Sequence, residues 1–124
     1  MKFKRDLVKY VRDKAKSGYI KDNECYICGI TDKLDFHHFY GLTELLDTWL
    51  RMNNITIETE QDILDVREQF IGENYDKVYN KAVTLCHQHH LRLHSIYGKR
   101  PKLIHAEKQE RWVELQREKN NGMV

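Results

Sequence analysis

Two short stretches concentrate the side chains that bind metals in proteins. The stretch VTLCHQHHLRLH, residues 83–94, holds one cysteine and four histidines, and CYICG, residues 25–29, holds the other two cysteines of the chain. Thiolate and imidazole are the usual ligands of structural zinc, often supplied as two short chelating pairs with two residues between the ligands. The spacing therefore predicts a structural zinc ion with the ligands Cys25, Cys28, Cys86 and His89.

The two pairs lie far apart along the chain, with 57 residues between Cys28 and Cys86. Closing so long a loop costs conformational entropy, and structural zinc offsets that cost with on the order of 10 kcal/mol of binding free energy at neutral pH. The plain alternative is that Cys86 is a small buried apolar residue and His89 a surface residue. Two chelating pairs in a chain with no other cysteine favour the zinc interpretation.

A second group of imidazoles remains once His89 is assigned to zinc. His90 and His94 are four residues apart, so on a helix both side chains leave the same face. His37 and His38 are adjacent, so on a strand they point to opposite faces. We predict a catalytic divalent cation held by His37, His90 and His94, with His38 left as the general base. In the plain alternative His94 is an ordinary exposed residue. We read His87 as a surface residue or as one that supports the metal ligands from behind.

The elements that must position these groups follow from hydrophobic periodicity. Leu42, Leu45, Leu46, Trp49 and Leu50 recur with the period of an amphipathic helix. Thr59-Glu-Gln-Asp62 resembles a capping box at the start of another helix, and Gly29 allows the chain to reverse after the first cysteine pair. The pattern predicts strands over 34–40 and 82–85 and helices over 3–16, 42–52, from 59, from 89 and over 103–120.

Length and composition indicate one ordinary globular domain. The chain has 124 residues, of which 40% are hydrophobic and 32% charged. No apolar run approaches the roughly 20 residues that span a bilayer, and the basic N-terminus is too polar for a secretion signal, so we expect a cytoplasmic protein without membrane association. An odd count of three cysteines argues against a disulfide framework. A redox role for Cys25 and Cys28 would leave the histidines unexplained.

The formal net charge of +2 is unevenly distributed. Residues 1–21 carry eight Lys or Arg against two Asp, and residues 81–124 carry nine basic against four acidic side chains. Residues 42–80 carry nine acidic against three basic side chains. The two ends could face a polyanion such as DNA and the middle could not, although solvated helix faces would show the same pattern.

The motifs CYICG, LDFHHFYG and VTLCHQHHLRLH, in this order, closely resemble those of the HNH endonucleases, the ββα-metal (His-Me finger) nucleases. The resemblance spans residues 24–94. It implies an α+β fold: a small ββα-metal core formed by about 22–41 and 76–100, a helical insertion at about 42–75 between the two strands, and flanking N- and C-terminal helices, all within one domain.

The resemblance also implies a function, a metal-dependent DNA endonuclease. His38 stands at the position of the general base, and His37, His90 and His94 stand at those of the ligands of the catalytic cation. His89 replaces the cysteine usual at the fourth zinc position. The middle Asn of the motif orients the base; strict spacing from Cys86 puts it at Lys81, and we favour Asn80 instead.

The implied cofactors are one structural Zn²⁺ and a catalytic Mg²⁺, Mn²⁺ or other divalent transition metal, because imidazole ligands favour the latter. The implied partner is double-stranded DNA, with a homodimer or a phage or host protein as a second candidate partner. The helix from residue 89 would lie along the minor groove. Candidates for phosphate contacts are Arg92, Lys99, Arg100 and Lys102. The competing hypothesis is a zinc-stabilised nucleic-acid-binding module without catalysis.

Overall fold

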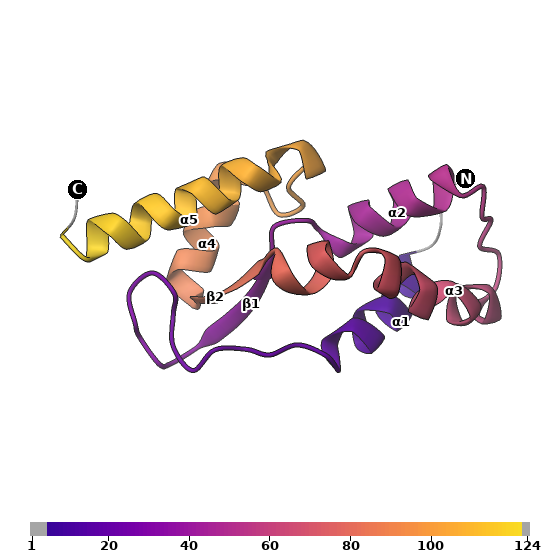
Figure 1. The fold of residues 1–124 in the computed structure, drawn as a ribbon, viewed down its shortest axis with the longest axis horizontal. Coiled ribbons are helices and arrows are strands. Elements are labelled where there is room, and N and C mark those ends of the chain that lie inside the picture. Colours follow the sequence, from indigo (N-terminus) through magenta and orange to yellow (C-terminus); the bar gives the residue numbers. More distant parts are fainter. Residues whose placement is uncertain (1–4, 123–124) are drawn as a thin grey trace.

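The structure, a computed structural model, describes residues 5–122 and is an α+β fold with one two-stranded antiparallel sheet. Its elements are α1 (Arg5–Lys16), β1 (Leu34–His38), α2 (Leu42–Met52), α3 (Glu60–Glu73), a π-helical turn (Asp76–Asn80), β2 (Ala82–Cys86), α4 (His87–Tyr97), a 3₁₀ turn (Leu103–His105) and α5 (Ala106–Asn120). Figure 1 shows an elongated molecule with α1, α2 and α3 at one end, α4 and α5 at the other, and the sheet between them.

The three helices at one end enclose an apolar interior, which we call the helical cluster. The apolar stripe of α2 is buried as its period predicts, and it meets α1 and α3. Trp49 and Phe70 pack edge to face with their ring centroids 5.5 Å apart. The buried members of the cluster are Val11, Ala15, Leu42, Leu45, Leu46, Trp49, Leu50, Ile57, Ile63, Phe70, Ile71 and Val78.

The sheet, α4 and α5 enclose a second and smaller interior, which we call the sheet cluster. Strands β1 and β2 pair so that Leu34 lies opposite Cys86 and His37 opposite Val83. Helix α4 follows β2 without a loop and packs on both strands, and α5 packs on α4 (Figure 1). The buried members of the cluster are Cys25, Ile27, Phe39, Leu85, Cys86, Leu93, Ala106 and Val113.

Several boundaries differ from the sequence predictions. Strand β1 ends at His38 instead of Tyr40, and α4 begins at His87 instead of His89, since β2 runs directly into the helix. The predicted helix 103–120 opens with a 3₁₀ turn. The π-helical turn before β2 was not predicted. The predicted start of the first helix, residues 3 and 4, lies outside the described residues.

Other local predictions are confirmed. Helix α2 has the predicted bounds. At α3 the Thr59 side chain accepts from the Asp62 backbone, while the Asp62 carboxylate accepts from the backbone N–H of Thr59, so both halves of the capping box are present. Gly29 has φ +76°, the left-handed conformation that the reversal after Cys28 requires.

Within residues 5–122 no helix has the length and apolarity to cross a bilayer.

Candidate metal centre

The two chelating pairs come together at one end of the sheet. The potential ligand atoms of Cys25, Cys28, Cys86 and His89 all lie within 4.8 Å of one another. The turn at residues 25–30 is closed by backbone hydrogen bonds from Gly29 to Cys25 and from Cys25 to Ile30. A further bond, from the Tyr26 N–H to the Thr84 carbonyl at 2.9 Å, joins this turn to β2, which ends in the second pair.

The spacing of these four groups fits a tetrahedral zinc site. The Cys28 and Cys86 sulfurs are 3.9 Å apart, and Nδ1 of His89 lies 3.3 Å from the Cys86 sulfur. Zn–S bonds of about 2.3 Å and Zn–N bonds of about 2.1 Å give tetrahedral edges of roughly 3.8 and 3.6 Å. The three cysteines are free thiols in the structure. The donor set is therefore the one that structural zinc prefers.

Bringing the thiols together changes the pKa values of Cys25 and Cys28. Burial, with a smaller contribution from the neighbouring Cys25 and Cys86, raises the pKa of the Cys28 thiol to about 11. At Cys25 burial also raises the pKa, but backbone N–H groups around its sulfur outweigh burial and leave the pKa below its usual value. A dication among these thiols favours their ionised form.

A second group lies between β1 and α4. The ring nitrogens of His37, His90 and His94 also lie within 4.8 Å of one another. Nδ1 of His37 is 3.1 Å from Nε2 of His90, which is 3.0 Å from Nε2 of His94. His90 and His94 are neighbours on α4, as the four-residue spacing predicted, and His37 faces them from the strand.

The other nitrogen of each ring has an acceptor of its own. Nδ1 of His90 donates to the Asp35 carboxylate at 3.0 Å, and Nδ1 of His94 donates to the Gly98 carbonyl at 2.7 Å. Nε2 of His37 lies 2.8 Å from the amide oxygen of Gln109. A neutral imidazole carries one N–H, so a ring that donates on one side presents a lone pair on the other.

Three lone pairs therefore converge on one point without a proton between them. Such an arrangement is repulsive unless a cation accepts all three, and histidine ligands whose second nitrogen is held by a carboxylate or carbonyl are typical of metal sites. Nitrogens 3.0 to 3.1 Å apart also match adjacent ligands of an ion with metal–nitrogen bonds of about 2.1 Å. These residues could hold a divalent ion and leave further coordination positions open.

Burial favours the neutral form of two of these imidazoles, His37 and His90, and metal ligands must be neutral. It lowers the pKa of His37 to about 3, with the hydrogen bond to Gln109 acting in the opposite direction. Burial also holds the pKa of His90 below its usual value, against the opposing hydrogen bond to Asp35. At neutral pH both rings are therefore available as ligands.

His38 points to the opposite face of β1, as strand alternation predicted. Its ring lies 4.9 Å from that of Tyr19 and 5.3 Å from that of Phe36, measured between ring centroids. Its Nε2 is buried and has no hydrogen-bonding partner among residues 5–122. Burial lowers the pKa of His38 to about 4, so the ring is a neutral proton acceptor at pH 7.

The two candidates for the middle position of the motif, Asn80 and Lys81, make different contacts. Asn80 is exposed, and its amide donates to the Asp76 carboxylate at 3.0 Å across one turn of the π-helical segment. The next residue contacts the strand that carries the histidines: the Lys81 carbonyl accepts from the Phe39 N–H at 3.1 Å. The structure thus brings together the groups Cys25/Cys28/Cys86/His89 and His37/His90/His94, and it leaves His38 and Asn80 outside both.

The four basic candidates for phosphate contacts are exposed, but two of them are already engaged. The Arg100 guanidinium binds the Glu44 carboxylate at 2.6 Å, which links the loop after α4 to α2. The Arg92 guanidinium lies 5.8 Å from the centre of the Trp112 ring. Lys99 and Lys102 extend into solvent. Surface ion pairs of this kind contribute little stability, so a phosphate could replace the carboxylate at Arg100.

Two residues of the site escaped the sequence analysis. Asp35 accepts hydrogen bonds from His90 and, at 3.1 Å, from the exposed His87. Burial raises the pKa of the Asp35 carboxyl, but the hydrogen bonds from His87 and His90 outweigh burial and lower it. Its position two residues before His37, hence on the same strand face, was a usable signal. Gln109 lies on α5 and offered no signal.

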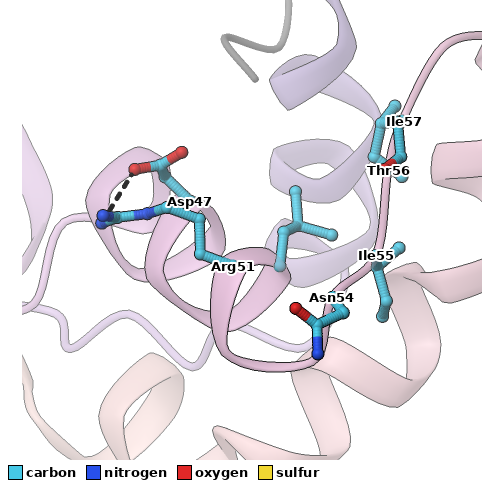
Figure 2. A pocket seen from close by; sticks show the side chains of 7 residues that line it. Asp47, Arg51, Asn54, Ile55, Thr56 and Ile57 are labelled. Atoms are coloured by element: carbon cyan, nitrogen blue, oxygen red, sulfur yellow. Dashed lines mark ion pairs between the residues drawn. The ribbon is translucent and has the colours of Figure 1, made fainter.

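A pocket of about 300 Å³ lies elsewhere, at the C-terminal end of α2 (Figure 2). Its lining is Asp47, Leu50, Arg51, Asn54, Ile55, Thr56 and Ile57. Figure 2 shows the Asp47–Arg51 ion pair, at 3.2 Å, on its rim. None of these residues belongs to the cysteine or histidine groups.

Comparison with known proteins indicates a nuclease. No solved structure matches the chain. The model of the nicking endonuclease family of phage T5 matches residues 1–123, nearly the full length. The members of such a family are nucleases, and their substrate is DNA. Because that match covers nearly the whole chain, the chain belongs to the nicking endonuclease family.

Proposed function

We propose that this chain nicks double-stranded DNA by the chemistry of the HNH endonucleases, with a catalytic divalent cation held by His37, His90 and His94. The observation that supports it most strongly is the convergence of three imidazole lone pairs, each fixed by a hydrogen bond on the far side of its ring. Neutral imidazoles favour Mn²⁺ or another transition metal, and an ion with open positions also admits Mg²⁺.

The proposal extends to the organisation of the chain. β1, β2 and α4 would form the ββα-metal core, within residues 22–41 and 76–100 of a single domain. Residues 42–75, which include α2 and α3, would be an insertion between the two strands. The close packing of α4 on both strands supports this assignment, because it is the contact that places the helix histidines opposite the strand histidine.

A structural Zn²⁺ bound by Cys25, Cys28, Cys86 and His89 would hold this core together. The support is the tetrahedral spacing of the donor atoms. β2 ends at Cys86 and α4 begins at the next residue, so the proposed zinc site lies where the strand turns into the helix. It would thereby fix the direction in which α4 leaves the sheet.

We assign proton abstraction to His38. Nε2 of His38 would take the proton from the attacking water, whose oxygen forms the new bond to phosphorus as the bond from phosphorus to the 3′ oxygen breaks. Its neutral ring and its unpartnered Nε2 support this role. Because that atom is buried, side chains around the ring, which include Tyr19 and Phe36, have to move before water can reach it.

The remaining residues position the substrate. When bound, the cation would neutralise charge on the phosphate and on the leaving oxygen. Arg92, Lys99, Arg100 and Lys102 would contact phosphates along the backbone. Asn80 would orient His38 by bridging the connection between the two strands, which requires its amide to leave Asp76. The backbone hydrogen bond from Phe39 to Lys81 lies next to this position.

A plasmid-nicking assay tests these assignments. Supercoiled DNA is incubated with zinc-loaded protein and Mg²⁺, Mn²⁺ or Co²⁺, and open-circular product is quantified for wild type, His90→Ala and His38→Ala. We expect wild type to nick, and each variant to lose at least about 100-fold in rate, the scale of general-base catalysis. His105→Ala, which removes a histidine outside both groups, is the matched control and should nick normally.

Each component can fail separately. Intact plasmid with every metal would reject the catalytic proposal and favour a binding module. Full activity of His90→Ala would reject the histidine site. Full activity of His38→Ala, with His90→Ala inactive, would reject only the role of His38 and move the search for the base to the face of β1 that carries Asp35.

A further inference from the structure

The residue that orients His37 comes from the last helix of the chain. Gln109 lies in the first turns of α5, and its side chain is fully buried (0% exposed). It is one of three buried polar residues among the described part of the chain, with His37 and Thr84. A buried amide with both ends hydrogen-bonded has a defined orientation, and here that orientation has a chemical consequence.

The amide bridges two residues on the same face of the chain at the end of β1. Its nitrogen donates to the Phe39 carbonyl at 3.2 Å, and its oxygen lies 2.8 Å from Nε2 of His37. A carbonyl can only accept, so the NH₂ end must face Phe39 and the oxygen must face the ring. The proton of His37 is thereby placed on Nε2, and the lone pair on Nδ1 faces His90.

The other tautomer of His37, with the proton on Nδ1, would make two of the three ligand atoms unavailable to an ion. If the proton were on Nδ1, it would point along the 3.1 Å contact to Nε2 of His90, whose lone pair would accept it. Two of the three ligand atoms would then be engaged with each other. Of the three histidines, only His37 takes its outer hydrogen bond from an element beyond the strands and α4: His90 uses Asp35 of β1 and His94 uses Gly98 at the end of α4.

We propose that Gln109 is a positioning residue that selects the Nε2–H tautomer of His37, so that the histidine site reaches its full affinity for an ion only when α5 is docked. The proposal rests on the histidine metal site described above. Outer hydrogen-bonding partners of histidine ligands typically change metal affinity by 10–100-fold. Gln109 therefore makes α5 a part of the active site, although no residue of that helix belongs to the motifs in the sequence.

The tautomer is measured directly, without metal in the histidine site. Long-range ¹H–¹⁵N NMR of the zinc-loaded protein should show His37 protonated at Nε2. Gln109→Met keeps the length of the side chain but removes the acceptor, so the proton should move to Nδ1. Gln109→Glu retains an acceptor, so the wild-type tautomer should return.

Affinity for Co²⁺ is measured on the same zinc-loaded proteins by titration calorimetry, and the visible absorption of thiolate-bound cobalt reports any exchange at the cysteines. Gln109→Met should bind Co²⁺ about 10–100-fold more weakly, and Gln109→Glu within a few-fold of wild type. The matched control is Val113→Ala, also buried on α5 but without a hydrogen bond; it should lower Tm and leave Co²⁺ affinity unchanged.

The outcomes separate this inference from the proposed function. A folded Gln109→Met with the wild-type tautomer and wild-type Co²⁺ affinity overturns the role of Gln109 and leaves the histidine site intact. Equal loss of affinity in Gln109→Met and Val113→Ala shows that packing alone matters, and also overturns it. Absence of Co²⁺ binding that depends on His90 rejects the metal site itself, and the inference with it.

Discussion

The helical cluster and the sheet cluster differ in the kinds of residue that they bury. The helical cluster is apolar throughout, with Phe70, Leu46 and Ile63 fully buried. The sheet cluster is smaller, and two of its buried members are the cysteines of the proposed zinc site. The buried polar residues His37, Thr84 and Gln109 lie on its elements.

This difference indicates how each half is stabilised. The helices can rely on apolar area removed from water, at about 25 cal/mol per Å². The interior of the sheet half contains cysteines and histidines that could hold ions, so we expect its stability to depend on whether an ion is bound. We expect the two halves to respond unequally to loss of metal and to loss of apolar volume.

The largest expected effect is that of zinc removal. Excess chelator should withdraw on the order of 10 kcal/mol of binding free energy and expose the backbone amides of β1, β2 and α4 to fast hydrogen exchange. Amides of α2 and α3 should remain protected. Exchange followed by mass spectrometry measures both at once, and simultaneous loss of protection in the two halves would show that they do not differ in this way.

A large-to-small substitution in the helical cluster should instead lower the free energy of unfolding and leave zinc binding unaffected. Phe70→Ala removes a fully buried ring and should cost about 3–5 kcal/mol in urea unfolding, with zinc affinity unchanged. Leu93→Ala, the matched substitution on α4 in the sheet cluster, should cost about 2–5 kcal/mol and also weaken zinc. Equal zinc affinities in the two variants would show that zinc binding does not depend more on the sheet cluster than on the helical cluster.

Loss of a single hydrogen bond to His90 should weaken ion binding at the histidine group only. Asp35→Ala deprives His90 of its acceptor and should weaken Co²⁺ binding at the histidine group by about 10–100-fold, with zinc retained. Asp32→Ala, an exposed aspartate of the same region, is the control. Zinc release from Asp35→Ala at the same rate as cobalt would mean that the two groups do not bind independently.

The smallest effect concerns pH and the helical half. Hydrogen bonds from the backbone of Glu58 and Thr59 hold the pKa of the Asp62 carboxyl below its usual value. A depressed pKa gives a contribution to stability that is present above the unfolded pKa, about 3.9, and is lost as pH falls through the folded value. The protection of the amides in the first turn of α3, taken relative to the intrinsic exchange rate at each pH, should therefore fall below about pH 4 in wild type, and much less in Asp62→Asn.

Strong local signals made part of this fold predictable. The five apolar residues of α2 recur with the helical period, so both its bounds and its buried face followed from the sequence. The capping box at Thr59 is likewise a local interaction, four residues long. The spacing of cysteines and histidines indicated which side chains meet, because side chains three or four residues apart can chelate one ion.

The remainder depended on contacts that no short pattern contains. Gln109 meets His37 across 72 residues, and the loose periodicity of α5 did not indicate which of its residues turns inward. Asp35 is a single aspartate whose partner is 55 residues away. The π-helical turn and the early start of α4 depend on how the chain approaches β2, so they are set by tertiary packing rather than by local preference.

His89 and His90 are consecutive on α4, yet one lies in the cysteine group and the other in the histidine group. Successive residues of a helix are about 100° apart around its axis, so α4 cannot rotate to suit one group without displacing the other. If ions fill both groups as proposed, a compound that removes the one held by the cysteines would also shift His90, and with it the proposed catalytic site. Inhibitors of such an enzyme need not compete with DNA at all.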